Sequence, residues 1–283
     1  MRVFKYVICA LALALLCSCG AKREESIDEQ TAVSTPPVQT VAPPVQPTTA
    51  PTAVPTELPA VTPSKTAEPK KERAGIKGRI ICIDAGHAVT SIKKKEPVAP
   101  GSSEMKAGAV SGTSGKTMTE EQLNLKVALK LQKALEAAGA DVVMTRTTSK
   151  ADITNVDRAK IANDANADLA IRIHADGMEN SSARGMSMLV PTGKYIKDEK
   201  LISKSRRAGE AVLAETVKAT GAKNRGISER SDMTGFNWSE VPVILLEMGF
   251  MTNEEEDRLL STDEYQDKIV SGIVNGLEKY FSE

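Results

Sequence analysis

Apolar residues follow two different spacings from about residue 79 to the C-terminus, and each spacing predicts a different kind of element. Short runs of β-branched and aliphatic residues predict buried strands at 80–83, 141–145, 169–173, 185–190 and 241–246. Apolar residues three and four apart predict amphipathic helices at 120–138, 155–166, 201–220 and 264–281. Because strands and helices alternate, we expect a single-domain α/β fold, with an open, mostly parallel or mixed sheet and helices on both faces.

The helix at 120–138 has the clearest boundaries. Thr119 and Gln122 have the spacing of a capping box at its start, and Gly139 is placed to end it. The segment before it, 88–116, is rich in Lys, Gly, Ser and Pro and shows no helical or strand period. We expect it to be a long loop, and such loops beside a site are more often functional than idle.

The first 19 residues predict a lipoprotein-type signal peptide. Arg2 and Lys5 precede an apolar stretch at 7–16, which is too short to span a membrane. It ends in Leu-Cys-Ser-Cys, which resembles a bacterial lipobox and implies cleavage before Cys19 and lipidation of its thiol. The alternative is an ordinary cleavage site without lipid.

Residues 20–78 form a Pro/Thr-rich segment without a helical or strand period, which is typical of an extended, disordered linker. If Cys19 carries a lipid, this linker is a spacer that holds a domain away from a membrane; otherwise it is a tail with no assigned role. The remaining residues, 79–283, are enough for one substantial domain.

Charge and cysteine content argue against a nucleic-acid-binding protein and against a disulfide-stabilised protein. The 37 basic and 37 acidic residues balance, so the composition does not indicate nucleic acid as a partner. Three of the four cysteines lie within residues 1–19, which leaves Cys82 without a partner for a disulfide. Stability must therefore come from an ordinary core, and we expect a monomer.

The chain has two histidines, His87 and His174, and both follow a predicted strand. In open α/β sheets, ligands bind beyond the carboxyl ends of strands. Neutral imidazole is the commonest protein ligand of zinc, so the pair indicates a metal site. A single such histidine would more often be structural, but two at equivalent strand ends favour the metal.

A catalytic zinc site usually has three protein ligands and an open position for water. At about 100° per residue, Glu120 falls on the apolar stripe of its helix, whereas Glu121 is rotated away from it. A carboxylate on a buried face is costly unless it is paired or bound to metal, so Glu120 is the better third ligand. The alternative is a first-turn acid that stabilises the helix start.

Glu247 follows the strand Val-Pro-Val-Ile-Leu-Leu and would point into the same crevice as the histidines. Such a carboxylate can take a proton from zinc-bound water and pass it to a leaving amine. The alternative is a carboxylate that accepts backbone hydrogen bonds in a turn. The chain lacks His-Glu-x-x-His, which excludes a thermolysin-type protease helix.

Five ordered blocks resemble the zinc-dependent N-acetylmuramoyl-L-alanine amidases of the amidase-3 family. They are Ile-Asp-Ala-Gly-His at 83–87, Glu-Glu-Gln-Leu-Asn-Leu at 120–125, Arg-Ala-Lys-Ile-Ala-Asn at 158–163, Ile-His-Ala-Asp at 173–176 and Glu-Met-Gly-Phe-Met-Thr-Asn at 247–253. The resemblance implies that His87, Glu120 and His174 bind one Zn²⁺ per domain and that Glu247 is catalytic. It also implies the family's zinc amidase fold over about 79–281.

The chain departs from many relatives at Arg172, where they have Ser, and at Asp176, where they have Asn. Neither is a ligand in the family, so we expect altered substrate contacts. We assign substrate binding to Arg158, Arg172, Asp176 and Arg225. The three arginines would bind the carboxylates of the stem peptide.

The resemblance implies a peptidoglycan hydrolase that uses zinc-activated water to cleave the amide between N-acetylmuramic acid and L-alanine. Its partners would be peptidoglycan and, through a lipid on Cys19, the extracytoplasmic face of a bacterial membrane. Two alternatives remain at this point: a non-catalytic peptidoglycan-binding lipoprotein, and a zinc peptidase that cleaves another stem-peptide bond.

Overall fold

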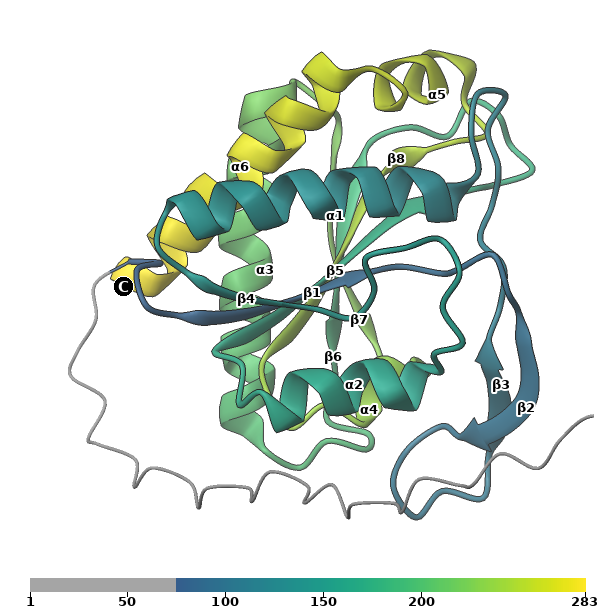
Figure 1. Ribbon diagram of the computed structural model, residues 1–283, viewed down its shortest axis with the longest axis vertical. Coiled ribbons are helices and arrows are strands. Elements are labelled where there is room, and N and C mark those ends of the chain that lie inside the picture. Colours follow the sequence, from purple (N-terminus) through teal and green to yellow (C-terminus); the bar gives the residue numbers. More distant parts are fainter. Residues whose placement is uncertain (1–74) are drawn as a thin grey trace, which may run out of the picture. The chain divides into compact units, whose positions relative to one another are not determined.

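A computed structural model describes residues 75–283, which form a six-stranded sheet (Figure 1). The strands lie in the order β4-β1-β5-β8-β6-β7. The first four of these are mutually parallel, whereas β6 runs antiparallel to β8 and parallel to β7. Their bounds are β1 (Ile80–Ala85), β4 (Asp141–Met144), β5 (Leu169–Asp176), β6 (Met186–Pro191), β7 (Asn224–Arg230) and β8 (Val243–Phe250). The predicted mostly parallel, mixed sheet is confirmed.

Helices cover both faces of the sheet, as expected for an α/β fold (Figure 1). One face carries α1 (Glu120–Ala137), α3 (Glu199–Thr220) and α6 (Asp263–Ser282). The other face carries α2 (Asn155–Asp164) and the single turn α4 (Thr234–Asn237). A short helix, α5 (Glu254–Leu260), follows β8. Among the described residues, no helix combines the length and apolar character that a membrane crossing requires.

Side chains alternate between the two faces of each strand, and this alternation separates the core from the site. Ile83, Ile173 and Leu246 point toward α1, α3 and α6, where they belong to the larger core cluster. Cys82 and Leu245 point the other way and pack beneath α2 and α4. Further along these strands, toward their carboxyl ends, the residues on this second face are polar: Asp84 on β1, Arg172 and His174 on β5, and Glu247 on β8. The second face is therefore apolar under the helices and polar toward the carboxyl ends.

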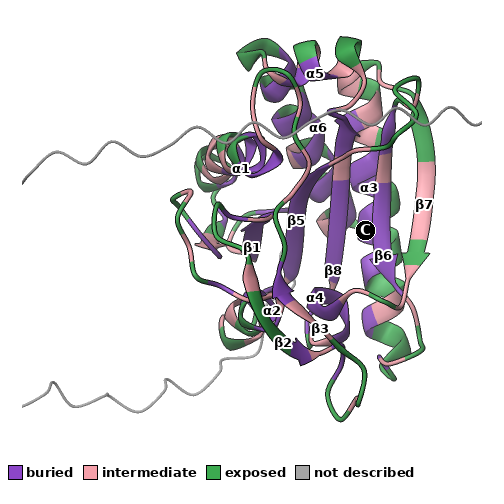
Figure 2. Ribbon diagram, turned by 90° about the vertical axis from the view of Figure 1, so that its right-hand side faces the viewer, coloured by how far each residue is buried: buried purple, intermediate pink, exposed green. Residues whose placement is uncertain are grey.

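The prediction of a structureless segment at 88–116 was wrong. It contains an antiparallel hairpin of β2 (Ile92–Pro97) and β3 (Met105–Ala109), which is a sheet of its own. The sequence Ile-Lys-Lys-Lys-Glu-Pro shows no apolar alternation because the lysines of β2 are exposed (Figure 2). The edge strand β7 was missed for a similar reason, since its residues are exposed or half-buried; the short α4 and α5 were also not predicted.

Hydrogen bonds attach the hairpin to α2, to α4 and to Trp238 at the end of α4. The indole N–H of Trp238 donates to the Pro97 carbonyl at 2.9 Å, and the Asn237 amide donates to the Val98 carbonyl at 3.0 Å. The Asn155 amide donates to the Gly108 carbonyl at 2.9 Å. These hydrogen bonds hold both strands of the hairpin in place next to the polar part of the sheet.

The predicted boundaries of α1 are confirmed. The backbone N–H of Thr119 donates to Gln122 Oε1 at 3.2 Å, and Gly139 ends the helix at a φ of 88°. At the start of the described region, Ile76 is buried and packs in the main core, although we had placed residues up to 78 in the linker. The predicted signal peptide at 1–19, lipidation of Cys19 and the linker up to residue 74 lie outside the described residues.

Candidate metal centre and active site

Three of the predicted site residues converge from three different elements. His87 follows β1, Glu120 opens α1, and His174 lies near the end of β5. One ligand atom from each lies within 4.8 Å of the others. Glu120 Oε1 is 3.2 Å from His87 Nε2 and 3.1 Å from His174 Nδ1. The fold therefore brings two imidazoles and a carboxylate to one point.

The two distances from Glu120 Oε1 to the ring nitrogens fit a small divalent cation. Nitrogen and oxygen ligands at about 2.0–2.1 Å from a tetrahedral zinc lie roughly 3.3 Å from one another. The distances from Glu120 Oε1 to the two ring nitrogens are 3.2 and 3.1 Å. Two imidazoles and one carboxylate are also a donor set found in catalytic zinc sites.

The turn after β1 has an uncommon backbone conformation at His87. His87 has a φ of 57°, in the left-handed region, which a residue with a side chain adopts at a cost and which is most often found at functional sites. A Cβ on Gly86 would lie 2.3 Å from the His174 ring. Glycine at 86 is thus needed for the two histidines to approach each other.

Glu120 is held in place by several donors. It is 3% exposed, and its carboxylate accepts from the Asn124 amide at 3.1 Å and from the Ala175 N–H at 3.2 Å. Glu121 is also buried, which differs from the expectation that it would rotate away from the buried face. Its Oε1 accepts from the Thr119 hydroxyl at 2.9 Å, so Glu121 faces the helix start rather than the histidines.

The charge states of His174 and Glu120 suit a metal ligand set. Burial lowers the pKa of His174 to about 4, so its ring is neutral at pH 7. Burial opposes ionisation of Glu120, but hydrogen bonds from His174 and His87 hold the pKa of Glu120 well below its usual range. Burial alone would lower the pKa of His87, and the hydrogen bond and charge of Glu120 raise it instead.

Glu247 lies beside this cluster on the neighbouring strand, where β5 and β8 pair His174 with Glu247. Its Oε2 is buried and has no hydrogen-bonding partner among the described residues. Burial, together with the negative charges of Glu120 and Asp176, raises the pKa of Glu247 to about 8. A carboxyl group with such a pKa can both accept and donate a proton near neutral pH.

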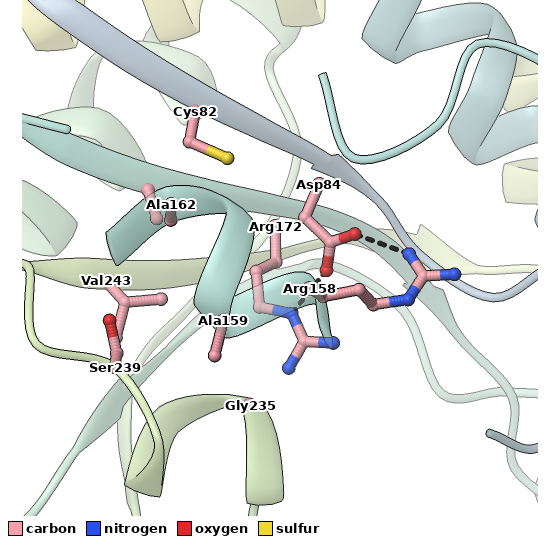
Figure 3. Close-up of a pocket in the computed structure, with 10 residues that line it drawn as sticks. Cys82, Asp84, Arg158, Ala159, Ala162, Arg172, Gly235, Ser239 and Val243 are labelled. Atoms are coloured by element: carbon pink, nitrogen blue, oxygen red, sulfur yellow. Dashed lines mark hydrogen bonds and ion pairs between the residues drawn. The ribbon is translucent and has the colours of Figure 1, made fainter. Parts of the chain in front are cut away.

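Two of the predicted substrate-binding arginines share one buried carboxylate (Figure 3). Arg158 pairs with Asp84 Oδ1, and Arg172 Nε donates to Asp84 Oδ2 at 2.7 Å. Burial opposes ionisation of Asp84, but these guanidinium groups hold the pKa of its carboxyl well below the usual range. Arg158 also donates to the carbonyls of Ala85 and His87, each at 2.8 Å, so it supports the histidine turn.

A pocket of about 430 Å³ opens beside the histidines. Arg172 lies in its wall, together with residues of the hairpin and of the segment that leads into α4. Asp176 accepts from the N–H of Gly177 at 2.8 Å, and Arg225 stacks over the Phe250 ring at 4.8 Å. Neither Asp176 nor Arg225 lines this pocket.

Sequence reasoning missed Asp84, Asn124 and Arg146. Asn124 is fully buried and donates to both Glu120 and the Gly86 carbonyl. Arg146 donates to the carbonyls of Ala85, Gly86 and Glu121, each at 2.8 Å. A signal existed for Asn124, which is a polar residue four positions after Glu120 on the buried stripe of the helix.

The chain is similar to known proteins over most of the described region. The chain is 28% identical to YqiI of Bacillus subtilis over 220 residues, which cover 78% of this chain and 90% of that protein. It is 31% identical over 221 residues to the probable cell wall amidase LytH of Staphylococcus aureus, covering 76% of this chain and 63% of LytH. The chain thus spans less than two thirds of the length of LytH.

Solved structures have the same fold. The amidase Ami1 from Mycobacterium smegmatis superposes with a TM-score of 0.67 at 25% identity, covering 74% of this chain and 99% of that one. An N-acetylmuramoyl-L-alanine amidase from Clostridium difficile superposes with a TM-score of 0.58 at 29% identity, covering 72% and 97%. The N-acetylmuramoyl-L-alanine amidase family matches residues 81–279, a segment that includes His87, Glu120, His174 and Glu247. On this match, the chain belongs to the N-acetylmuramoyl-L-alanine amidase family.

Proposed function

We propose that this amidase is zinc-dependent and cleaves the amide bond between N-acetylmuramic acid and the L-alanine of the stem peptide. The observation that carries the proposal is the convergence of His87, Glu120 and His174 beside a carboxyl group, Glu247, whose Oε2 has no partner among the described residues. His87, Glu120 and His174 would hold the metal. When bound, zinc acidifies water and polarises a carbonyl group.

Glu247 moves the protons in this mechanism. Its carboxylate accepts a proton from the water that attacks the lactyl carbonyl carbon. A carbon–oxygen bond forms, and the carbon–nitrogen bond then breaks as Glu247 returns the proton to the departing L-alanine nitrogen. The products are a lactyl carboxylic acid on the sugar and a stem peptide with a free N-terminus.

The pocket beside the histidines would receive the substrate. Of the four predicted substrate-binding residues, Arg172 lies in its wall, so we keep it as a direct neighbour of the bound peptide. Arg158 would act through Asp84 and the His87 turn, because its guanidinium group is buried against them. Asp176 and Arg225 would bind substrate outside this pocket.

We further propose that the enzyme works on the extracytoplasmic side of a bacterial membrane, anchored by a lipid on Cys19. The similarity to LytH, named a cell wall amidase, and the lipobox-like Leu-Cys-Ser-Cys support this location. The Pro/Thr-rich segment would extend the domain toward peptidoglycan.

Product analysis tests the reaction. The purified protein is incubated with zinc and peptidoglycan, and the fragments are identified by mass spectrometry, with Glu247→Gln as the variant and the exposed Glu240→Gln as its control. We expect stem peptides with new L-alanine N-termini from the wild type and from Glu240→Gln, and none after chelation or from Glu247→Gln.

Each alternative has its own outcome in this experiment. Cleavage of a different amide would reassign the substrate bond and make the protein a zinc peptidase. Tight binding to peptidoglycan without any product or bound zinc would identify a binding lipoprotein. The complete set of three candidate ligands and Glu247 favours the enzyme over that binding role.

A further inference from the structure

The segment that leaves the hairpin, Val110–Thr113, touches two of the three proposed zinc ligands. His87 Nδ1 lies 2.8 Å from the Val110 carbonyl oxygen. The backbone N–H of Thr113 donates to Glu120 Oε2 at 2.9 Å. Val110 contacts the ring nitrogen of His87 that points away from Glu120, and Thr113 contacts the carboxylate oxygen of Glu120 that points away from the histidines.

These two contacts determine which atom of each side chain faces the other proposed ligands. A carbonyl oxygen can only accept, so His87 Nδ1 must carry a proton, which leaves Nε2, the atom that faces Glu120 Oε1, as the ring nitrogen that can bind a metal. The Thr113 N–H occupies Oε2 of Glu120 and leaves Oε1 toward both histidines. Partners of this kind orient ligands and raise metal affinity.

Gly112 lets the segment come this close. A Cβ at this position would lie 2.4 Å from Glu120 Oε2 and 2.8 Å from His87 Cδ2. Both distances are too short for any side chain, so even alanine would force the ligands or the segment to move. The requirement comes from this close approach and not from a left-handed backbone, because Gly112 is not among the residues with positive φ.

The segment is attached on both sides at places away from the ligands. Before it, the Gly108 carbonyl accepts from the Asn155 amide at 2.9 Å. After it, the buried Asp257 of α5 accepts from the Lys116 N–H at 2.9 Å and from the Thr117 hydroxyl at 3.2 Å. The hairpin and α5 therefore set the position of the segment before any metal arrives.

We propose that Val110–Thr113 is a positioning segment for the metal site, which orients His87 and Glu120 through the Val110 carbonyl and the Thr113 N–H. The insert at 88–116 is then part of the metal-binding apparatus as well as a wall of the pocket. This inference rests on the proposed zinc site.

The test measures zinc affinity by competition with a chromophoric chelator at fixed pH, comparing the wild-type protein with Gly112→Ala and Ser111→Ala. Ser111 is exposed and adjacent, so it is the matched control. Loss of such contacts typically lowers metal affinity about 10–100-fold. We expect that loss in Gly112→Ala and an affinity within about twofold of wild type in Ser111→Ala.

Fluorescence of Trp238, whose indole is bonded to the hairpin, reports whether each variant is folded. A folded Gly112→Ala variant with wild-type zinc affinity would overturn the inference. If Gly112→Ala does not fold, Asp257→Ala replaces it; weaker zinc binding is expected there, and unchanged affinity would equally overturn the inference. Absence of zinc binding by the wild type would instead refute the proposed function.

Discussion

Folding raises the pKa of Glu247 to about 8, because burial disfavours the carboxylate and the charges of Glu120 and Asp176 oppose it. A carboxyl group whose pKa rises on folding binds its proton more tightly in the folded state. The unfolded chain therefore loses this proton first, and the free energy of unfolding falls progressively as the pH rises from the ordinary value of 4.5 to about 8. Below that window the group is protonated in both states and has no such cost.

Glu247→Gln removes this cost while it removes the proton carrier. For the metal-free protein at pH 7, we expect the free energy of unfolding to rise by about 1–3 kcal/mol, with little difference from wild type at pH 4. Urea denaturation at the two pH values measures it. Glu240→Gln, which changes an exposed glutamate, should match wild type at both. A Glu247→Gln variant that is less stable at pH 7 would show that its carboxylate has favourable partners.

The partners of a single arginine could not be predicted from the sequence. Arg172 is an unusual residue two positions before His174, and its sequence context indicates a substrate contact. In the structure it shares the Asp84 carboxylate with Arg158 beneath the site. The sequence distance between Arg172 and Asp84 is 88 residues, so no local pattern pairs them.

At the scale of elements, α3 and α6 pack with unusually close backbones. A Cβ on Gly276 would lie 2.5 Å from Val212 Cα and 2.9 Å from the Ala211 carbonyl oxygen. A Cβ on Gly272 would lie 2.4 Å from Thr216 Cα. Two glycines one turn apart thus form the face of α6 that meets α3.

Gly276→Ala tests this contact. Replacing glycine by alanine inside a helix ordinarily adds up to about 1 kcal/mol of stability. Here we expect the opposite sign, a loss of about 1–3 kcal/mol, since the added methyl group meets backbone atoms that cannot rotate away. Chemical denaturation measures the change, with the exposed Asn275→Ala in the same helix as control. Stabilisation by Gly276→Ala would mean that the helices can separate at little cost.

At the scale of the whole molecule, the sheet places the proposed ligands on a framework held by a large core. His87 follows β1, His174 lies near the end of the neighbouring strand β5, and α1 brings Glu120 over them from the face that carries the main core. Metal binding should therefore be linked to folding of the entire domain, because the ligand set exists only when β1, β5 and α1 are assembled.

Zinc is expected to raise the melting temperature. A ligand present at 100 times its dissociation constant adds about 2.7 kcal/mol, which corresponds to roughly 5–10 °C for a domain of this size. Differential scanning calorimetry with zinc or with a chelator measures the shift. His87→Ala should show little or no shift, and magnesium should not replace zinc in the wild type. Equal melting temperatures with zinc and with chelator would contradict a specific site.

Local signals in the sequence determined the strands, the long helices and their ends. Apolar spacing reports burial directly, so β1, β5, β8 and α1 could be predicted to within a few residues. The same reasoning placed two histidines at strand ends and selected Glu120 over Glu121, and the structure brings those three residues together. Their role as zinc ligands and that of Glu247 as proton carrier remain predictions.

The surroundings of those residues depend on tertiary contacts that the sequence does not reveal. The hairpin was not predicted because its strands bury few side chains and carry exposed lysines. The positioning segment at 110–113, the Asp84 pairing with two arginines and the bonds of Arg146 all join groups far apart in sequence. Such contacts depend on which strands become neighbours, and the hydrophobic pattern of one chain does not specify neighbours. The sequence therefore determined the elements and candidate ligands, whereas packing decided how those ligands are held.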